Sequence, residues 1–159
     1  MKRLIACALA LSALSGCAAA TFTSGKIKIG VTVYDSYDTF ISELMDDFDA
    51  DITDKTDVTL EKYDASKIQT TQDKQVEKMI EDGCNVICVN LVDRTAPKKI
   101  IDLAKANNVP IVFFNRELVA EDLQQWSGLY YVGANAEESG VMEGQIAVNA
   151  WKNSPAADK

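Results

Sequence analysis

The sequence predicts an α/β fold built on a doubly wound, mostly parallel open sheet. Two observations lead to this fold class. Strand patterns and helix patterns alternate along the chain, and several of the strand patterns are apolar through their middle instead of alternating with polar residues. Such strands are buried on both faces, as happens when helices cover both sides of a parallel sheet. Right-handed crossovers then favour the strand order 2-1-3-4-5.

Five segments have the composition of strands, being rich in β-branched and apolar residues. They are residues 26–34, 58–63, 85–90, 110–114 and 129–132. Between them lie segments with apolar residues at helical spacing. Ser66 with Gln69 predicts a capping box at the start of the second helix, and Gly83 predicts its left-handed end. The other helices are expected at residues 39–50, 95–107 and 135–151, the last opened by a capping box at Asn135.

The first residues indicate export. Lys2 and Arg3 precede an apolar stretch at residues 4–14, and small residues follow it. This is the anatomy of a signal peptide, and the stretch is too short to span a bilayer in the mature chain. An ordinary secretory signal followed by a chance cysteine is one interpretation.

The segment Leu14-Ser15-Gly16-Cys17 also resembles the processing site of bacterial lipoproteins. By that resemblance Cys17 is lipidated and becomes the mature N-terminus. We therefore expect a lipoprotein signal peptide at residues 1–16 and a lipidated tether at residues 17–25. The protein would sit at the outer face of the cell membrane through its lipid anchor only, or in the periplasm.

Charge argues against nucleic acid as a partner. Removing residues 1–16 takes away Lys2 and Arg3 and no acid, which moves the net charge from −8 to −10. A surface this acidic is repelled by phosphate backbones.

The cysteines do not indicate a disulfide or a zinc site. Cys84 and Cys88 lie on one predicted strand, where about 13 Å separates residues four apart, whereas a disulfide needs Cα atoms within about 7 Å. The chain has no histidine to complete a zinc site. We expect two free, buried thiols.

Polar residues follow the first predicted strand, at the edge where parallel sheets of this kind bind ligands. The loop carries Asp35 and Asp38 and no glycine, so it does not suit a phosphate. Carboxylates accept hydrogen bonds from the hydroxyls of a neutral polyol, and Phe40 can present a flat apolar face to a sugar ring. The alternatives are that Asp38 caps the next helix and that Phe40 belongs to the core.

Two further loops carry polar groups at the same edge. Asn90 ends the third strand, and its amide can donate and accept hydrogen bonds or form a turn. Asp93 can help to start the next helix. After the fourth strand, Arg116 and Glu117 are expected to form a solvated ion pair.

These residues resemble the galactose/glucose-binding family among the type I periplasmic binding proteins of bacterial ABC sugar importers. The resemblance spans residues 26–151. It rests on the segments Ile29-Gly30-Val31-Thr32-Val33-Tyr34, Tyr37-Asp38-Thr39-Phe40, Asn90-Leu91-Val92-Asp93, Val112-Phe113-Phe114-Asn115-Arg116-Glu117, Tyr130-Tyr131-Val132-Gly133 and Glu138-Ser139-Gly140. It implies that Asp38 and Asn90 bond sugar hydroxyls and that Phe40 stacks on the ring.

The resemblance also implies the domain organisation. Residues 26–134 would form the N-terminal sugar-binding lobe, and residues 135–159 the start of a second lobe that is otherwise missing. Relatives have a calcium loop near this point, of which Asp158 would be the first ligand. Calcium needs about 6–8 oxygen ligands, so we expect no cofactor in this chain, with calcium allowed in a longer protein.

The function expected from these observations is a solute-binding lipoprotein, not an enzyme, that delivers galactose and/or glucose to the membrane subunits of an ABC importer. A chemotaxis or sensor protein is a further partner that the resemblance allows.

A secreted carbohydrate-active enzyme is the alternative, because Asp35 and Asp38 are a pair of acids, although no nucleophile–base pair is evident. A receiver-type signalling domain would share the strand order but not the export signal. No helix-turn-helix precedes Lys26, which argues against a transcriptional regulator.

Overall fold

The computed structural model of the chain describes residues 25–154. Cys17 and Asp158 lie outside the described residues, so the predicted lipid anchor and calcium ligand stay predictions. Within residues 25–154, no helix has both the length and the apolar character needed to cross a membrane.

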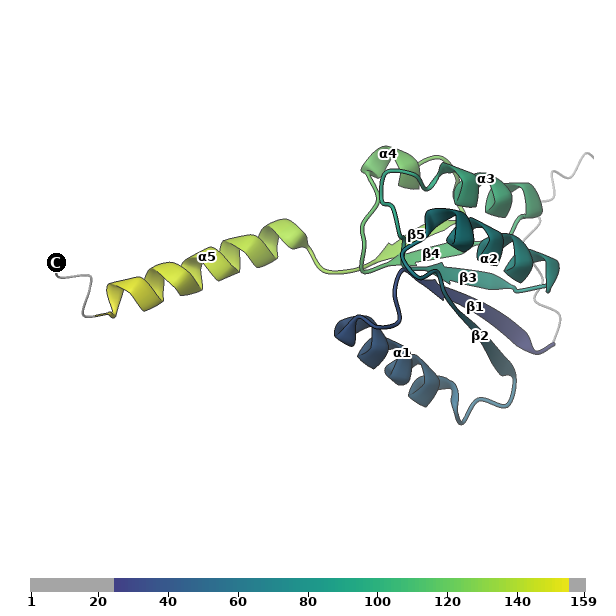
Figure 1. Cartoon of the computed structure of the whole chain (residues 1–159), viewed down its shortest axis with the longest axis horizontal. Coiled ribbons are helices and arrows are strands. Elements are labelled where there is room, and N and C mark those ends of the chain that lie inside the picture. The colour runs from purple at the N-terminus through teal and green to yellow at the C-terminus, as the bar shows by residue number, and fades with distance from the viewer. Residues whose placement is uncertain (1–24, 155–159) are drawn as a thin grey trace, which may run out of the picture.

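The predicted sheet is confirmed. Five strands pair in parallel in the order β2-β1-β3-β4-β5 (Figure 1). β2 lies on one side of β1, and β3, β4 and β5 follow on the other side. The chain therefore reverses its direction across the sheet between β2 and β3. The strands are β1 (Ile27–Val33), β2 (Val58–Asp64), β3 (Val86–Val89), β4 (Ile111–Phe114) and β5 (Leu129–Val132).

Helices cover the sheet from both sides (Figure 1). α2 and α3 lie on one face and α1 lies on the other. The last helix, α5, extends away from the sheet and buries none of its residues. The short α4 was not predicted. The helices are α1 (Thr39–Ile52), α2 (Gln69–Glu81), α3 (Lys98–Asn107), α4 (Ala120–Leu123) and α5 (Ala136–Lys152).

The core has two parts, one on each face of the sheet. Val76 and Met79 of α2 and Ile100 of α3 are fully buried against one face. On the other face, Ile41 of α1 packs against Val31 of β1. The burial of both faces explains the apolar composition of the strands.

The predicted capping box of Ser66 and Gln69 is wrong. The second helix begins at Gln69, and its N-cap is Ile68, which makes no side-chain cap bond. Ser66 and Lys67 instead have positive φ angles of 49° and 63°. This turn directs the Lys67 N–H to the carbonyl of Tyr34, 2.7 Å away, so a contact with β1 replaces local capping.

The helix predicted to begin at Thr95 begins at Lys98. The N–H and hydroxyl of Thr95 both donate to Oδ1 of Asp93, at 2.8 and 2.7 Å. This turn keeps Thr95 out of the helix.

The left-handed end predicted at Gly83 is confirmed. Gly83 has a φ of 79°, and the N–H groups of Gly83 and Cys84 donate to the carbonyls of Ile80 and Met79, which is a Schellman ending. At the start of α5, half of the predicted capping box is present: Oδ1 of Asn135 accepts from the N–H groups of Glu137 and Glu138 at 3.1 Å, but the Glu138 side chain does not accept the N–H of Asn135.

Cys84 and Cys88 are free and buried, as predicted. Burial raises the pKa of each thiol to about 11, so both remain protonated thiols near neutral pH.

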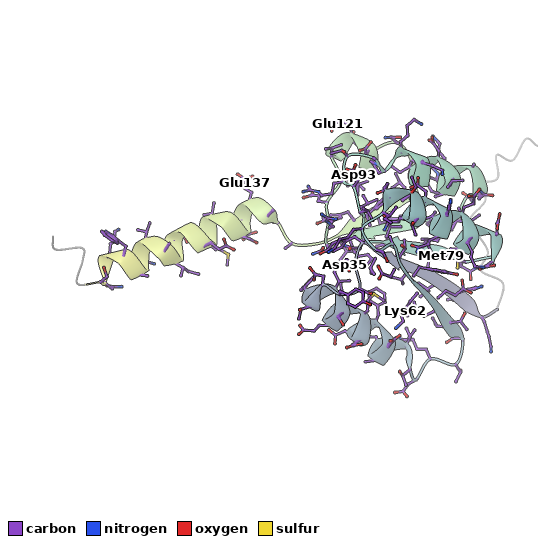
Figure 2. The ribbon with its side chains drawn as sticks, viewed as in Figure 1. Asp35, Lys62, Met79, Asp93, Glu121 and Glu137 are labelled. Atoms are coloured by element: carbon purple, nitrogen blue, oxygen red, sulfur yellow. The ribbon has the colours of Figure 1, made fainter. Side chains whose placement is uncertain are left out.

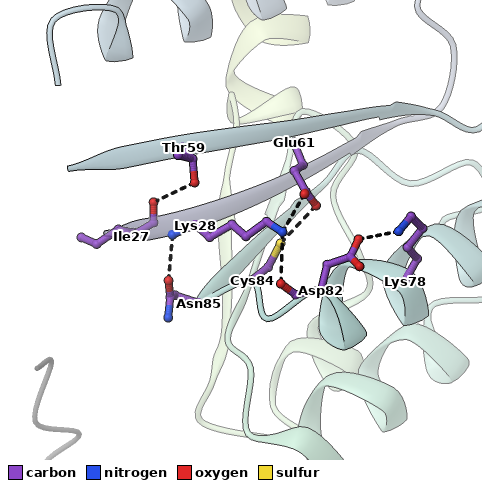
Figure 3. Close-up of polar contacts among 8 residues, drawn as sticks. All are labelled: Ile27, Lys28, Thr59, Glu61, Lys78, Asp82, Cys84 and Asn85. Carbon is purple, nitrogen blue, oxygen red and sulfur yellow. Dashed lines mark hydrogen bonds and ion pairs between the residues drawn. The ribbon is translucent and has the colours of Figure 1, made fainter. Parts of the chain in front are cut away.

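A charged network joins the elements at the amino-terminal end of β1 and β3 (Figure 3). Nζ of Lys28 lies 2.6 Å from Oε1 of Glu61 and donates to the carbonyl of Asp82 at 3.0 Å. Asp82 also pairs with Lys78 at 2.6 Å. The N–H of Lys28 donates to Oδ1 of Asn85 at 2.7 Å, and the N–H of Asn85 donates to the carbonyl of Lys28 at 2.8 Å. These contacts fix the end of the sheet opposite to the carboxyl ends of the strands.

The close approach of α2 to β1 requires a glycine at position 30. A Cβ atom placed on Gly30 would lie 2.2 Å from Sδ of Met79 and 3.2 Å from Sγ of Cys84. Both neighbours are buried, so they have little room to move.

We therefore predict that Gly30→Ala destabilises the protein by about 1–3 kcal/mol through overpacking. The free energy of unfolding is measured by urea denaturation. Gly144→Ala is the matched control, because a Cβ there meets open space on α5 and should leave stability unchanged or raise it slightly. Equal unfolding midpoints for Gly30→Ala and the parent would contradict the packing.

Candidate functional site

The carboxyl ends of β1, β3 and β4 bring three polar loops together. Thr32 of β1 lies beside Val89 of β3, which lies beside Phe113 of β4. The loops that follow therefore leave the sheet side by side. Figure 2 shows Asp35 and Asp93 toward the same end of the sheet, the end from which α5 extends.

Asp38 is a partly exposed carboxylate at the N-terminus of α1. Oδ1 accepts the N–H of Ile41 at 3.1 Å, and Oδ2 accepts the hydroxyl of Tyr34 at 2.6 Å. The Tyr34 hydroxyl, followed by the Ile41 N–H, lowers the pKa of Asp38 below its ordinary value. Asp38 is thus the helix cap that one interpretation predicted, and each oxygen retains a lone pair that can accept another hydrogen bond.

Asp35 is engaged within the protein. Asp35 is 6% exposed, and its Oδ2 pairs with Nζ of Lys67 at 2.9 Å. Oδ1 accepts the N–H of Tyr37 at 3.1 Å. These contacts, that of Lys67 first, lower the pKa of Asp35. Replacing Asp35 would therefore disturb the structure of the loop itself.

Phe40 is not a core residue. It is 57% exposed and lies on the wall of an open hollow of about 780 Å³. The hollow lies between α1, the ends of β4 and β5, and the first turns of α5. Its lining combines aromatic and charged side chains, among them Phe40, Phe48, Phe114, Arg116, Tyr131 and Glu143.

Asn90 lies beneath the site. It is fully buried, and Nδ2 donates to the carbonyl of Phe114 at 3.2 Å and to Oδ1 of Asn115 at 3.0 Å. Oδ1 accepts the N–H of Tyr34 at 3.3 Å. Since both amide hydrogens are engaged, a direct bond from Asn90 to a ligand hydroxyl would require Asn115 to move away.

Arg116 does not form the predicted ion pair with Glu117. Asn115 has a positive φ of 61°, and Nη1 of Arg116 donates to the carbonyls of Leu91 and Val92 at 2.7 and 2.9 Å. Its guanidinium carbon lies 4.5 Å from the centre of the Tyr34 ring. Two backbone acceptors and an aromatic face satisfy the guanidinium better than a neighbouring exposed carboxylate does.

Two glutamines of α2 also hold the site; the sequence indicated only a capping role for Gln69 and none for Gln72. Gln72 is buried, its Nε2 donates to the carbonyl of Asn90, and its Oε1 accepts the N–H of Val92, both at 2.9 Å. Oε1 of Gln69 accepts the N–H of Asp93 at 2.8 Å. The sequence offered one sign of this role for Gln72: it lies one turn before Val76, on the inward face of the predicted helix, where a polar residue needs buried hydrogen-bond partners.

Among residues 25–154, no group of acidic or cysteine side chains is arranged to hold a metal ion. The described part of the site is a carboxylate, an exposed aromatic ring and an ordered set of backbone and amide groups.

Comparison with known families identifies the family of the chain. Residues 29–157 match the periplasmic binding protein domain. The chain belongs to this family. Its members are solute-binding proteins, and their periplasmic location agrees with the export signal that the sequence predicts.

A relative supports the resemblance found in the sequence. The chain is 32% identical over 157 residues to the D-galactose/methyl-galactoside binding periplasmic protein MglB of Haemophilus influenzae, covering 99% of this chain and 47% of the relative. The chain thus spans about half the length of this relative.

Solved structures share the fold. A solute-binding protein of an ABC transporter from Bacillus halodurans, with bound myo-inositol, is 26% identical with a TM-score of 0.64, over 78% of this chain and 44% of that one. One from Mycobacterium smegmatis, with bound glycerol, is 26% identical with a TM-score of 0.70, over 82% and 42%. A galactofuranose binding protein, at 19% identity and a TM-score of 0.71 over 81% and 43%, supports the fold alone.

Proposed function

We propose that the chain forms one wall of a monosaccharide-binding cleft in a protein that captures galactose and/or glucose and delivers it to an ABC importer. The observation that carries the proposal is that Asp38, a partly exposed carboxylate, and Phe40, an exposed ring on the wall of the hollow, both stand at the start of α1, at the carboxyl ends of the strands. The ligands named for two of the similar proteins, D-galactose or methyl-galactoside and the cyclic polyol myo-inositol, support this class of ligand.

The chemistry of the two side chains suits a sugar. A charged carboxylate accepts strong hydrogen bonds from hydroxyl groups, and a flat aromatic face covers the C–H surface of a pyranose ring. Because the pKa of Asp38 is lowered, its carboxylate is charged throughout the neutral range. The relative that binds D-galactose favours galactose as the first ligand to test.

The ionisation of the acids argues against a carbohydrate-active enzyme. A glycosidase needs one carboxylic acid with a raised pKa as proton donor. Hydrogen bonds and Lys67 lower the pKa of both Asp35 and Asp38, so neither is held protonated near neutral pH. We therefore propose a binding protein without enzymatic activity.

Asp38→Asn separates the ligand role of this residue from its role as helix cap, because asparagine caps a helix as well as aspartate does. We expect the affinity of the chain for galactose and glucose to fall roughly tenfold or more, since hydrogen bonds to a charged acceptor are lost. Ligand-observed NMR measures this, because it detects weak binding by one wall of a cleft.

Asp46→Asn is the matched control, with the same change of charge at an exposed position of α1. If Asp38→Asn binds sugar as the parent and the control do, Asp38 is not the ligand and the proposed site fails.

The proposal includes attachment to the outer face of the membrane through Cys17, which the segment Leu14-Ser15-Gly16-Cys17 motivates. Serine lacks the thiol that would carry the lipid, and stable attachment to a membrane needs two or more acyl chains. We therefore expect Cys17→Ser to move the protein from the membrane fraction to the soluble fraction. Fractionation of cells that express each form, with immunoblotting, measures this. A serine variant that remains in the membrane fraction would refute the lipid anchor.

A further inference from the structure

Tyr34 connects the three loops of the site through groups on every side. Its hydroxyl donates to Oδ2 of Asp38 at 2.6 Å, and its N–H donates to Oδ1 of Asn90 at 3.3 Å. Its carbonyl accepts the N–H of Lys67 at 2.7 Å. The guanidinium of Arg116 lies over its ring, 4.5 Å from the centre. All its polar groups, and one face of its ring, are therefore engaged.

We propose that Tyr34 is the positioning residue of the sugar site, and that it fixes the orientation of Asp38 before a ligand arrives. This inference rests on the proposed function, because it assigns Tyr34 a role through Asp38 and no contact with the sugar.

The geometry explains the fixed orientation. The Ile41 N–H holds one oxygen of Asp38, and the Tyr34 hydroxyl holds the other. A carboxylate held at both oxygens cannot rotate about its Cβ–Cγ bond without losing a hydrogen bond. The remaining lone pairs then point in constant directions, so a ligand does not have to order the side chain when it binds.

Tyr34 is itself held in place. Arg116 covers its ring while Nη1 binds the carbonyls of Leu91 and Val92 in the next loop. Lys67 and Asn90 hold its backbone from the two neighbouring strands. The position of the hydroxyl is therefore set by β1, β2, β3 and β4 together.

Charged groups around Asp38 come from three segments. Asp35 belongs to the same loop, Lys67 comes from the loop before α2, and Arg116 from the loop after β4, where it faces Tyr34. Among the causes that lower the pKa of Asp38, the Tyr34 hydroxyl is the largest and Lys67 a smaller one, while the charge of Asp38 in turn opposes ionisation of Asp35. The same hydrogen bond raises the pKa of Tyr34.

Tyr34→Phe tests the inference, because it removes the hydroxyl and keeps the ring under Arg116. We expect the pKa of Asp38, followed by NMR of its carboxyl carbon in the sugar-free chain, to rise toward the ordinary value. We expect affinity for galactose to fall roughly threefold to tenfold at neutral pH. Binding should also be lost at a higher pH on acidification than in the parent, because Asp38 then protonates sooner.

Tyr37→Phe is the matched control, since it removes a hydroxyl from the same loop at a side chain that is 91% exposed. It should leave the pKa of Asp38 and the affinity unchanged. A purely structural hydroxyl would lower the stability of Tyr34→Phe without moving the pKa of Asp38.

The outcomes separate the two claims. An unchanged pKa of Asp38 in Tyr34→Phe overturns the positioning role whatever the protein binds. The positioning role is also overturned if the pKa of Asp38 rises in Tyr34→Phe while the variant binds galactose as tightly as the parent and loses it at the same pH on acidification. If Tyr34→Phe raises the pKa of Asp38 while the parent and Asp38→Asn bind sugar equally, the proposed site at Asp38 fails and the role of Tyr34 in it fails too, although the coupling of the two residues stands. If the parent binds no sugar, the proposed function itself fails.

Discussion

The pairing of β1 with both β2 and β3 is the constraint on which the site depends. Seven residues of β1 align with β2, and four of them align with β3 as well. This register leaves Tyr34 between the loop that contains Lys67 and the loop that begins at Asn90. The contact between Tyr34 and Asp38 depends on that position, because the backbone of Tyr34 meets the loops after β2 and β3 and its ring meets Arg116 in the loop after β4. A change of one residue in the register would point Tyr34 to the other face of the sheet.

Most of the fold could be predicted from the sequence, because its determinants are local or periodic. Apolar strands, helical stripes and the left-handed glycine at Gly83 indicated the elements, and the handedness of crossovers then indicated the strand order. The prediction failed where a tertiary contact outweighed a local pattern. The pattern at Ser66 has the composition of a capping box, but Lys67 reaches Tyr34 and Asp35 instead, and this requires the left-handed turn that excludes the box.

The site could be predicted only in part for the same reason. Asp38 and Phe40 lie just beyond the first strand, so the sequence placed them at the carboxyl edge of the sheet, and the structure leaves both at least partly exposed there. The burial of Asn90 and the inward turn of Arg116 could not be predicted, because they depend on carbonyl groups of Phe114, Leu91 and Val92 that no local pattern reveals. The result is a site in which exposed groups are available to a ligand and buried polar groups hold them in place.

We propose that the carboxyl ends of β1 and β4 form a surface that recognises a sugar ring. The most direct measurement is an NMR titration of the isotope-labelled chain with galactose, with the acyclic polyol sorbitol as a control that has hydroxyls but no ring face. We expect galactose to shift the backbone signals of residues 34–40 and 114–117, and sorbitol to shift them much less. Signals that shift instead along α2 and α3, or equal shifts with both compounds, would contradict it.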